Sequence, residues 1–185
     1  MSNYSDLCNE IQAEFPDFTM LYKDDSFLMK VLNVVLFVLS FGRQNKFMTS
    51  FITTIGNTVY LPRSWASMKE KDRLIVLRHE RVHMRQRRKY MSLPFAFLYL
   101  FFPLPFVFAY YRAKFEKEAY EESMRAAYEY YGVSIFKRPL YKESIIGHFT
   151  SGEYLWMWPF RKSIEAWYDE TVKNVIIHAT VNQFR

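Results

Sequence analysis

The spacing of hydrophobic residues in the first 41 positions predicts two helices of different character. Leu7, Ile11 and Phe15 lie four residues apart, which predicts a short amphipathic helix over 5–15, ended by the proline that follows. Residues 27–41 are mostly apolar and are broken by Lys30 and Asn33. A run of 15 is short for a membrane span. We therefore expect a buried or interfacial helix there.

Residues 47–61 change from helical spacing to strand composition. They are rich in Thr, Ile, Val and Phe, and Gly56-Asn57 lies within them. This combination predicts a β-hairpin that turns at Gly56-Asn57. We expect its second strand, 58–61, to form an edge of the sheet and to pair with an extended substrate.

Two long helices are expected after the hairpin. Ser67 and Glu70 have capping-box spacing, which predicts a helix over about 68–90 with a strongly basic C-terminal half. A second helix is expected over about 111–131, because Gly132 stands where a helix C-terminus favours glycine. In the tail, the pattern predicts a loop with some extended structure over 144–160, a helix over 164–175 and a final strand over 175–184.

Residues 93–111 form a stretch of 19 residues without a charge. Its length would permit a membrane span, but three prolines within it argue against one straight helix. We expect a broken apolar hairpin that packs on the core or makes a peripheral contact with a bilayer surface. The basic residues just before it have three interpretations: helix-dipole compensation, attraction to anionic lipid, and nucleic-acid binding. No nucleic-acid motif is present, so a nucleic-acid partner is not expected.

Length and composition indicate one domain over 1–185, with a core over about 47–131 and a C-terminal extension over 132–185. The chain has 185 residues, a net charge of +6 and 19% aromatic residues. Its one cysteine, Cys8, excludes a disulfide framework and a cysteine-based zinc site. The polar N-terminus lacks the features of a signal peptide. We therefore expect a cytoplasmic protein, with membrane association as an addition.

The chemistry of the chain centres on His79-Glu80-Arg81-Val82-His83, which has the pattern H-E-x-x-H. Two histidines four apart on a helix point the same way and can hold one Zn²⁺ together. The glutamate beside the first histidine is placed to take a proton from water. The sequence therefore predicts His79 and His83 as metal ligands and Glu80 as the catalytic base. The plain alternative is a helix with two surface histidines.

A catalytic zinc needs a third protein ligand, and Glu116 and Glu118 are the candidates. No downstream histidine has the metzincin spacing. Positions on the same helix face as Glu116 are small or aromatic, whereas those sharing the face of Glu118 are charged. We therefore predict Glu116 as the third metal ligand and Glu118 as a solvated charge.

Glutamate as third ligand defines the gluzincin metallopeptidases, which this chain resembles. Phe115 to Tyr120, FEKEAY, is similar to the E-x-x-A-D segment of the CAAX-processing and HtpX-like membrane peptidases, whose first glutamate binds zinc. In that match Tyr120 stands where those families carry an aspartate that orients a zinc-ligating histidine. The brevity of the chain resembles the minigluzincins. The resemblance covers about residues 50–131.

Together these features predict an α+β, zincin-like fold: a small twisted sheet, an active-site helix, a glutamate-bearing helix and accessory helices. The expected function is zinc-dependent hydrolysis of a protein or peptide substrate. One alternative is a non-catalytic zinc-bound module for binding or membrane association, and another is a latent form whose cleft is covered by a terminal segment. His148, Tyr154 and Tyr120 are candidates to stabilise the oxyanion. His178 is expected to be structural, and Trp156-Met157-Trp158 to anchor the tail on the core.

Overall fold

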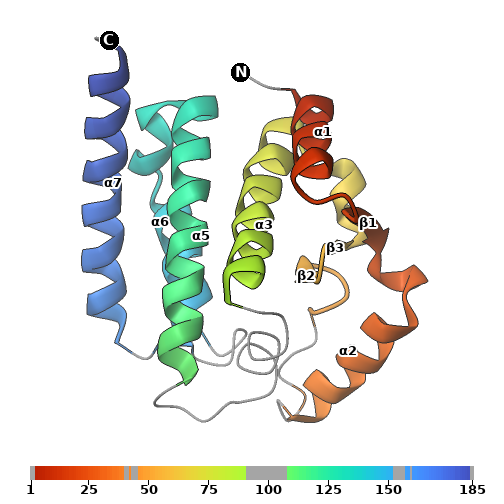
Figure 1. Ribbon diagram of the computed structural model, residues 1–185. Coiled ribbons are helices and arrows are strands. Elements are labelled where there is room, and N and C mark those ends of the chain that lie inside the picture. The colour runs from red at the N-terminus through yellow and green to blue at the C-terminus, as the bar shows by residue number, and fades with distance from the viewer. Residues whose placement is uncertain are drawn as a thin grey trace. The chain divides into compact units, whose positions relative to one another are not determined.

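The computed structural model describes residues 3–39, 42, 46–90, 108–151, 157–158 and 160–183. By its internal packing the chain divides into two compact units, residues 1–100 and residues 101–185 (Figure 1). The single domain expected over 1–185 stays a prediction, and its expected core, 47–131, includes residues of both units. The described part is mainly helical with a small mixed sheet, which is compatible with the expected α+β class.

The sheet of the first unit has three short strands in the order β1-β3-β2. Strand β3 (Thr58–Leu61) pairs in parallel with β1 (Thr19–Tyr22) and antiparallel with β2 (Thr53–Ile55). The expectation that 58–61 forms an edge is therefore wrong, because β1 pairs with its other side. Strand β1 was not predicted from the sequence, because its four residues show no clear alternation of polar and apolar side chains. The edges of the described sheet are β1 and β2.

The predicted hairpin is confirmed between β2 and β3. Ile55 pairs with Thr58, and Gly56 adopts a φ of 68°, a conformation that glycine reaches without strain. The first strand is shorter than expected, because residues 47–50 form a turn. Val59 is fully buried at the centre of the sheet.

Helix α1 (Tyr4–Glu14) confirms the first predicted helix. A capping box begins it: Asn3 Oδ1 accepts from the Asp6 amide at 2.9 Å, and Asp6 Oδ2 accepts from the Asn3 amide at 3.2 Å. Its apolar positions, Leu7 and Ile11, are buried, and α1 packs on α3.

Helix α3 (Glu70–Tyr90) carries the H-E-x-x-H sequence and follows a short 3₁₀ helix, η2 (Arg63–Ser67). The predicted role of Ser67 as N-cap is wrong. Its hydroxyl donates to the carbonyl of Ser64 at 2.8 Å, so Ser67 closes η2 instead, and α3 begins about two residues later than expected.

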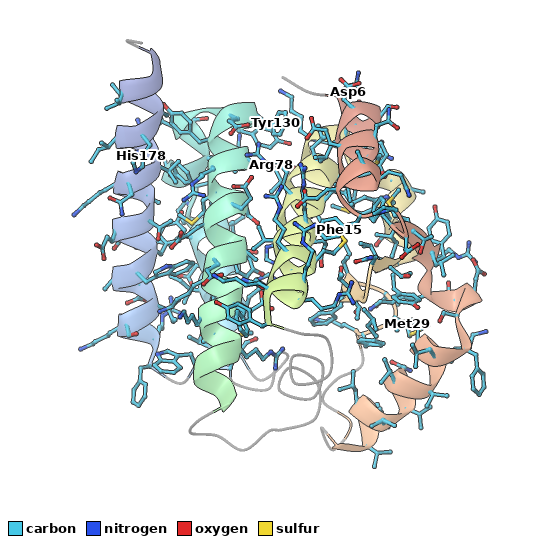
Figure 2. The ribbon with its side chains drawn as sticks, in the orientation of Figure 1. Asp6, Phe15, Met29, Arg78, Tyr130 and His178 are labelled. Atoms are coloured by element: carbon cyan, nitrogen blue, oxygen red, sulfur yellow. The ribbon has the colours of Figure 1, made fainter. Side chains whose placement is uncertain are left out.

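Helix α2 (Phe27–Leu39) follows the 3₁₀ helix η1 (Lys23–Asp25) and confirms the predicted helix over most of 27–41. It is not a buried helix. Met29, labelled in Figure 2, is fully buried, whereas seven large apolar side chains of α2 are exposed. Among the described helices, none combines the length and the apolar character needed to cross a bilayer.

Among its described residues the second unit has three long helices that alternate in direction: α5 (Phe108–Tyr131), α6 (Pro139–Thr150) and α7 (Arg161–Gln183) (Figure 1). A short 3₁₀ helix, η3 (Val133–Lys137), joins the first two. The predicted end of α5 is confirmed, because Gly132 has a φ of 69° and its amide donates to the Tyr128 carbonyl at 2.8 Å. Of the apolar stretch 93–111, all but the beginning of α5 lies outside the described residues.

Two predictions for the tail are wrong. Residues 144–150, expected as a loop, belong to α6, and residues 175–183, expected as a strand, continue α7. Short apolar runs do not distinguish a strand from the buried face of a helix, and here packing between α6 and α7 favours helix. The anchoring role of Met157 is confirmed, because it is buried in the core of this unit and Trp158 packs against that core.

Candidate metal centre

His79 and His83 lie one turn apart on α3 and face one another. Their Nε2 atoms are 3.1 Å apart, and the ring centroids are 4.8 Å apart with an interplanar angle of 75°. His83 is buried and His79 is half-buried. The i, i+4 spacing alone puts both rings on one helix face, as the sequence predicts.

The separation of the two nitrogens matches a shared metal ion. Two imidazole nitrogens bound at 2.0–2.1 Å to one tetrahedral zinc lie about 3.3 Å apart. The distance between His79 Nε2 and His83 Nε2 is 3.1 Å. Two protonated Nε2 atoms would repel each other at this distance. The pair therefore either shares one proton in a hydrogen bond or directs two lone pairs at one cation.

Gln86 determines which nitrogen of His83 carries the proton. Its Oε1 lies 3.0 Å from His83 Nδ1, and the Gln86 side chain is buried. An amide oxygen only accepts, so Nδ1 carries the hydrogen and Nε2 keeps its lone pair toward His79. Metal-binding histidines commonly donate their second ring N–H in this way.

Glu80 lies beside the sheet and is held by a residue of β2. Thr54 Oγ1 donates to Glu80 Oε2 at 2.6 Å, and the Glu80 side chain is buried. One carboxylate oxygen is thus held by a hydroxyl. The other oxygen, Oε1, can accept a further hydrogen bond.

Lys23 adds a buried basic group to the surroundings of Glu80. Its side chain is fully buried, with Nζ donating to the Phe47 carbonyl at 2.7 Å and lying 3.6 Å from the centre of the Phe47 ring. Burial lowers the pKa of Lys23 to about 7, and the negative charge of Glu80 acts in the opposite direction. The electrostatic environment of Glu80 therefore includes an amine near its titration point at neutral pH.

Ion pairs with α1 account for part of the basic cluster of α3. Arg81 and Arg85 each donate to Glu14 at 2.7 Å, and Arg88 lies 3.3 Å from the same carboxylate. The hydrogen bond from Arg85, with that from Arg81, lowers the pKa of Glu14 to about 2. These contacts fix the helix that carries the histidines against α1. Ion pairing with α1 is thus an explanation of the basic residues that differs from the three interpretations given from the sequence.

Glu116 lies on α5 in the second unit and is buried, as are Ala119, Ser123 and Ala127 on the same face. Glu118 is exposed. The inward face predicted for Glu116 and the solvated face predicted for Glu118 are therefore confirmed. A buried carboxylate requires a partner or a cation, which distinguishes Glu116 from a surface charge.

The expected oxyanion-stabilising residues have different outcomes. Tyr120 and His148 lie in the same unit with ring centroids 5.4 Å apart, on α5 and α6. His148 stands in the last turn of a helix, not in the loop expected from its flanking glycines. Tyr154 lies outside the described residues. His178 is exposed on α7 (Figure 2), so its expected structural role is not supported by burial.

Three residues of the first unit were missed from the sequence: Thr54, Gln86 and Lys23. Gln86 had a detectable signal, because a residue three positions after His83 shares its helix face. Thr54 and Lys23 had none, because their neighbours in the fold are 26 and 24 residues away along the chain.

No protein-family model matches the sequence, and no curated protein or solved structure matches it at a significant level.

Proposed function

We propose that the protein is a zinc-dependent metallopeptidase of the gluzincin type, with a zincin-like core built on α3. The observation that carries this proposal is the facing His79–His83 pair with its Nε2 atoms 3.1 Å apart. Beside it on the same helix, Glu80 is buried and held by Thr54. A structural zinc site has no use for a general base, so Glu80 favours catalysis over a static site.

Glu116 is the proposed third ligand. His79 and His83 each have a ring nitrogen and Glu116 has a carboxylate oxygen, which are ligand types that zinc accepts. Two histidines and one glutamate leave one position of a tetrahedral zinc open for water or substrate. Among the two candidate glutamates, Glu116 is the buried one.

The chemistry divides between the ion and the residues around it. Bound zinc would polarise a substrate carbonyl and lower the pKa of water at the open position. Glu80 would accept the proton of the attacking water through Oε1 and deliver it to the leaving amine. Thr54 would keep the Glu80 carboxylate in one orientation during both transfers. Gln86 would hold the His83 tautomer that leaves Nε2 free to bind.

A peptide is the proposed substrate because an edge strand adjoins Glu80. Strand β2 lies at an edge of the described sheet, and its Thr54 contacts Glu80 directly. Alternate residues of an edge strand direct their N–H and C=O groups outward, where an extended peptide can pair with them. This replaces the pairing first expected on 58–61, which is the central strand.

Metal analysis of four purified proteins tests the ligand set: wild type, His83→Ala, Glu116→Ala and Glu118→Ala. We expect about one zinc per chain in the wild type and in Glu118→Ala, and strong loss in the other two. The two glutamate variants remove the same group from the same helix, so a general loss of helix stability affects both. Equal zinc content in Glu116→Ala and Glu118→Ala would refute Glu116 as a ligand.

Digestion of a peptide library tests turnover. We expect cleavage by the wild type, inhibition by a chelator and loss of at least about 10²-fold in Glu80→Gln, with zinc retained, since a general base contributes about that much. Wild-type protein that holds zinc but cleaves no peptide would favour the non-catalytic zinc-bound module instead.

A further inference from the structure

Helix α2 presents an apolar surface to the outside, which reverses the usual amphipathic pattern. Phe27 is 81% exposed, Val38 64% and Val34 61%. Half of the exposed large hydrophobic residues in the described chain belong to this one helix: Phe27, Leu28, Val31, Val34, Val35, Phe37 and Val38. At 100° per residue, these positions cover about 180° of the helix circumference. We call them the α2 apolar face.

The composition of the α2 apolar face fits hydrocarbon better than a protein partner. The seven side chains are Val, Leu and Phe and none of them donates or accepts a hydrogen bond, while exposed Lys30 lies within the arc that they span. Protein interfaces are enriched in aromatic residues, Met and Arg and carry about one hydrogen bond per 100–200 Å², whereas five of the seven residues here are aliphatic and none forms a side-chain hydrogen bond. The opposite side of the helix is anchored in the first unit by fully buried Met29.

The length of α2 is suited to lying in a membrane surface. Thirteen residues extend for about 20 Å, whereas the hydrocarbon core of a bilayer is about 30 Å thick. None of the described helices could cross a bilayer. A half-cylinder of apolar side chains can instead enter the boundary between headgroups and acyl chains to a depth of about 5–10 Å.

The charge of the first unit favours an anionic lipid surface. Residues 1–100 contain 14 of the 25 basic residues and nine of the 19 acidic ones, so most of the net charge of +6 lies in the unit that carries α2. Lys30, on α2 itself, is exposed. Net basic charge in the unit that carries an inserted apolar helix supplies the second of the two signals that stable membrane anchoring requires.

We propose that the α2 apolar face inserts into the surface of an anionic bilayer and makes the protein a peripheral membrane protein. The proposal is independent of the metallopeptidase assignment, since no residue of the α2 apolar face belongs to the candidate metal centre. The proposed contact also differs from the membrane contact expected through 93–111, and insertion of α2 would be compatible with that contact or with its absence.

Vesicle co-sedimentation of the full chain tests the proposal with two matched double variants. Val34→Asn with Val38→Asn changes the α2 apolar face, and Ile177→Asn with Val181→Asn changes exposed apolar residues at the same spacing on α7. The probes are vesicles of phosphatidylcholine mixed with phosphatidylglycerol and vesicles of phosphatidylcholine alone. Neither double variant alters net charge, and circular dichroism spectra equal to the wild type would establish that both fold.

We expect the wild type to bind the mixed vesicles more tightly than phosphatidylcholine, with the difference shrinking as salt rises. The α2 double variant should bind at least about tenfold more weakly, because two apolar side chains no longer leave water. The α7 double variant should bind like the wild type. Equal binding of the two double variants, or no binding of the wild type to either vesicle, would overturn the proposal.

A fluorescent reporter gives a second readout that does not depend on affinity. Cys8 is the only cysteine, so Cys8→Ser provides a background in which Val34→Cys or Val181→Cys can carry an environment-sensitive dye. Mixed vesicles should shift the emission of the dye at position 34 to the blue and leave that at position 181 unchanged. A dimer in solution that the α2 double variant dissociates would assign the face to a second copy of the chain and overturn the proposal.

Discussion

Replacement of Gln86 by leucine isolates the effect of one hydrogen bond on the candidate metal centre. Gln86 is buried and accepts a hydrogen bond from His83 Nδ1 at 3.0 Å. Leucine has a similar size and fills the same space, so packing is largely kept. What disappears is the acceptor that holds the proton of His83 on Nδ1. The ring can then rotate or place its proton on Nε2, the nitrogen that faces His79.

The expected effect is a weaker affinity for zinc. Loss of a residue that orients a metal-binding histidine reduces metal affinity by about 10–100-fold, or about 1.4–2.7 kcal/mol. Glutamate at the same position should preserve the affinity, because its carboxylate accepts the same proton in a stronger, charge-assisted bond. Gln86→Leu should therefore weaken zinc binding, and Gln86→Glu should bind zinc at least as tightly as the wild type.

Competition with a chromophoric chelator measures these dissociation constants, with Gln12→Leu as the control. Gln12 is an exposed glutamine on α1, so its replacement should leave zinc affinity unchanged. Thermal melting of the metal-free proteins identifies any change that comes from folding alone. If Gln86→Leu bound zinc as tightly as the wild type, the assignment of the His83 tautomer, and the role of Gln86 with it, would be refuted.

Two further predictions concern Thr54 and Glu14. Thr54→Val removes the hydroxyl that donates to Glu80 at 2.6 Å while keeping the side-chain shape. We expect kcat to fall about tenfold, which corresponds to a loss of about 1.4 kcal/mol, with zinc content unchanged. An unaltered kcat would exclude an orienting role for Thr54. Glu14 has a folded pKa of about 2, below its ordinary 4.5, so its ion pairs stabilise the fold above pH 4.5 and lose this contribution as pH falls from 4.5 toward 2. The side chains of Arg85 and Arg88 are 50% and 59% exposed, so water screens their attraction to Glu14. We therefore expect Glu14 to contribute about 1–2 kcal/mol to the free energy of unfolding. Denaturant titrations of wild type and Glu14→Gln should show this difference above pH 5.5 and none near pH 2; a difference independent of pH would contradict the ion-pair explanation.

The structural features that the sequence predicted correctly are those determined by local interactions. The two long helices, the hairpin at Gly56 and the end of α5 at Gly132 all depend on residues within about four positions of one another. The burial of Glu116 and the exposure of Glu118 also follow from helix periodicity alone. Such patterns are read directly from the order of the residues.

The wrong predictions concern segments whose local sequence is compatible with more than one structure. Ser67 has the spacing of a helix cap, but its hydroxyl bonds the Ser64 carbonyl of the preceding 3₁₀ helix. Residues 175–183 have the composition of a strand, yet they extend α7, because packing on neighbouring helices overrides the weak preference of β-branched residues. The position of β3 depended on β1, whose partner is 39 residues away along the chain.

The sequence alone determined the identity and the facing of the H-E-x-x-H side chains, because a helix converts a spacing of four into a shared face. Only the tertiary structure showed that Thr54 holds Glu80, that Lys23 is buried in the same unit and that an edge strand adjoins Glu80. It alone also showed that the apolar side of α2 is exposed. The hydrophobicity of a segment indicates which surroundings favour it, but its exposure depends on which other segments cover it. Those segments come together only in the folded chain.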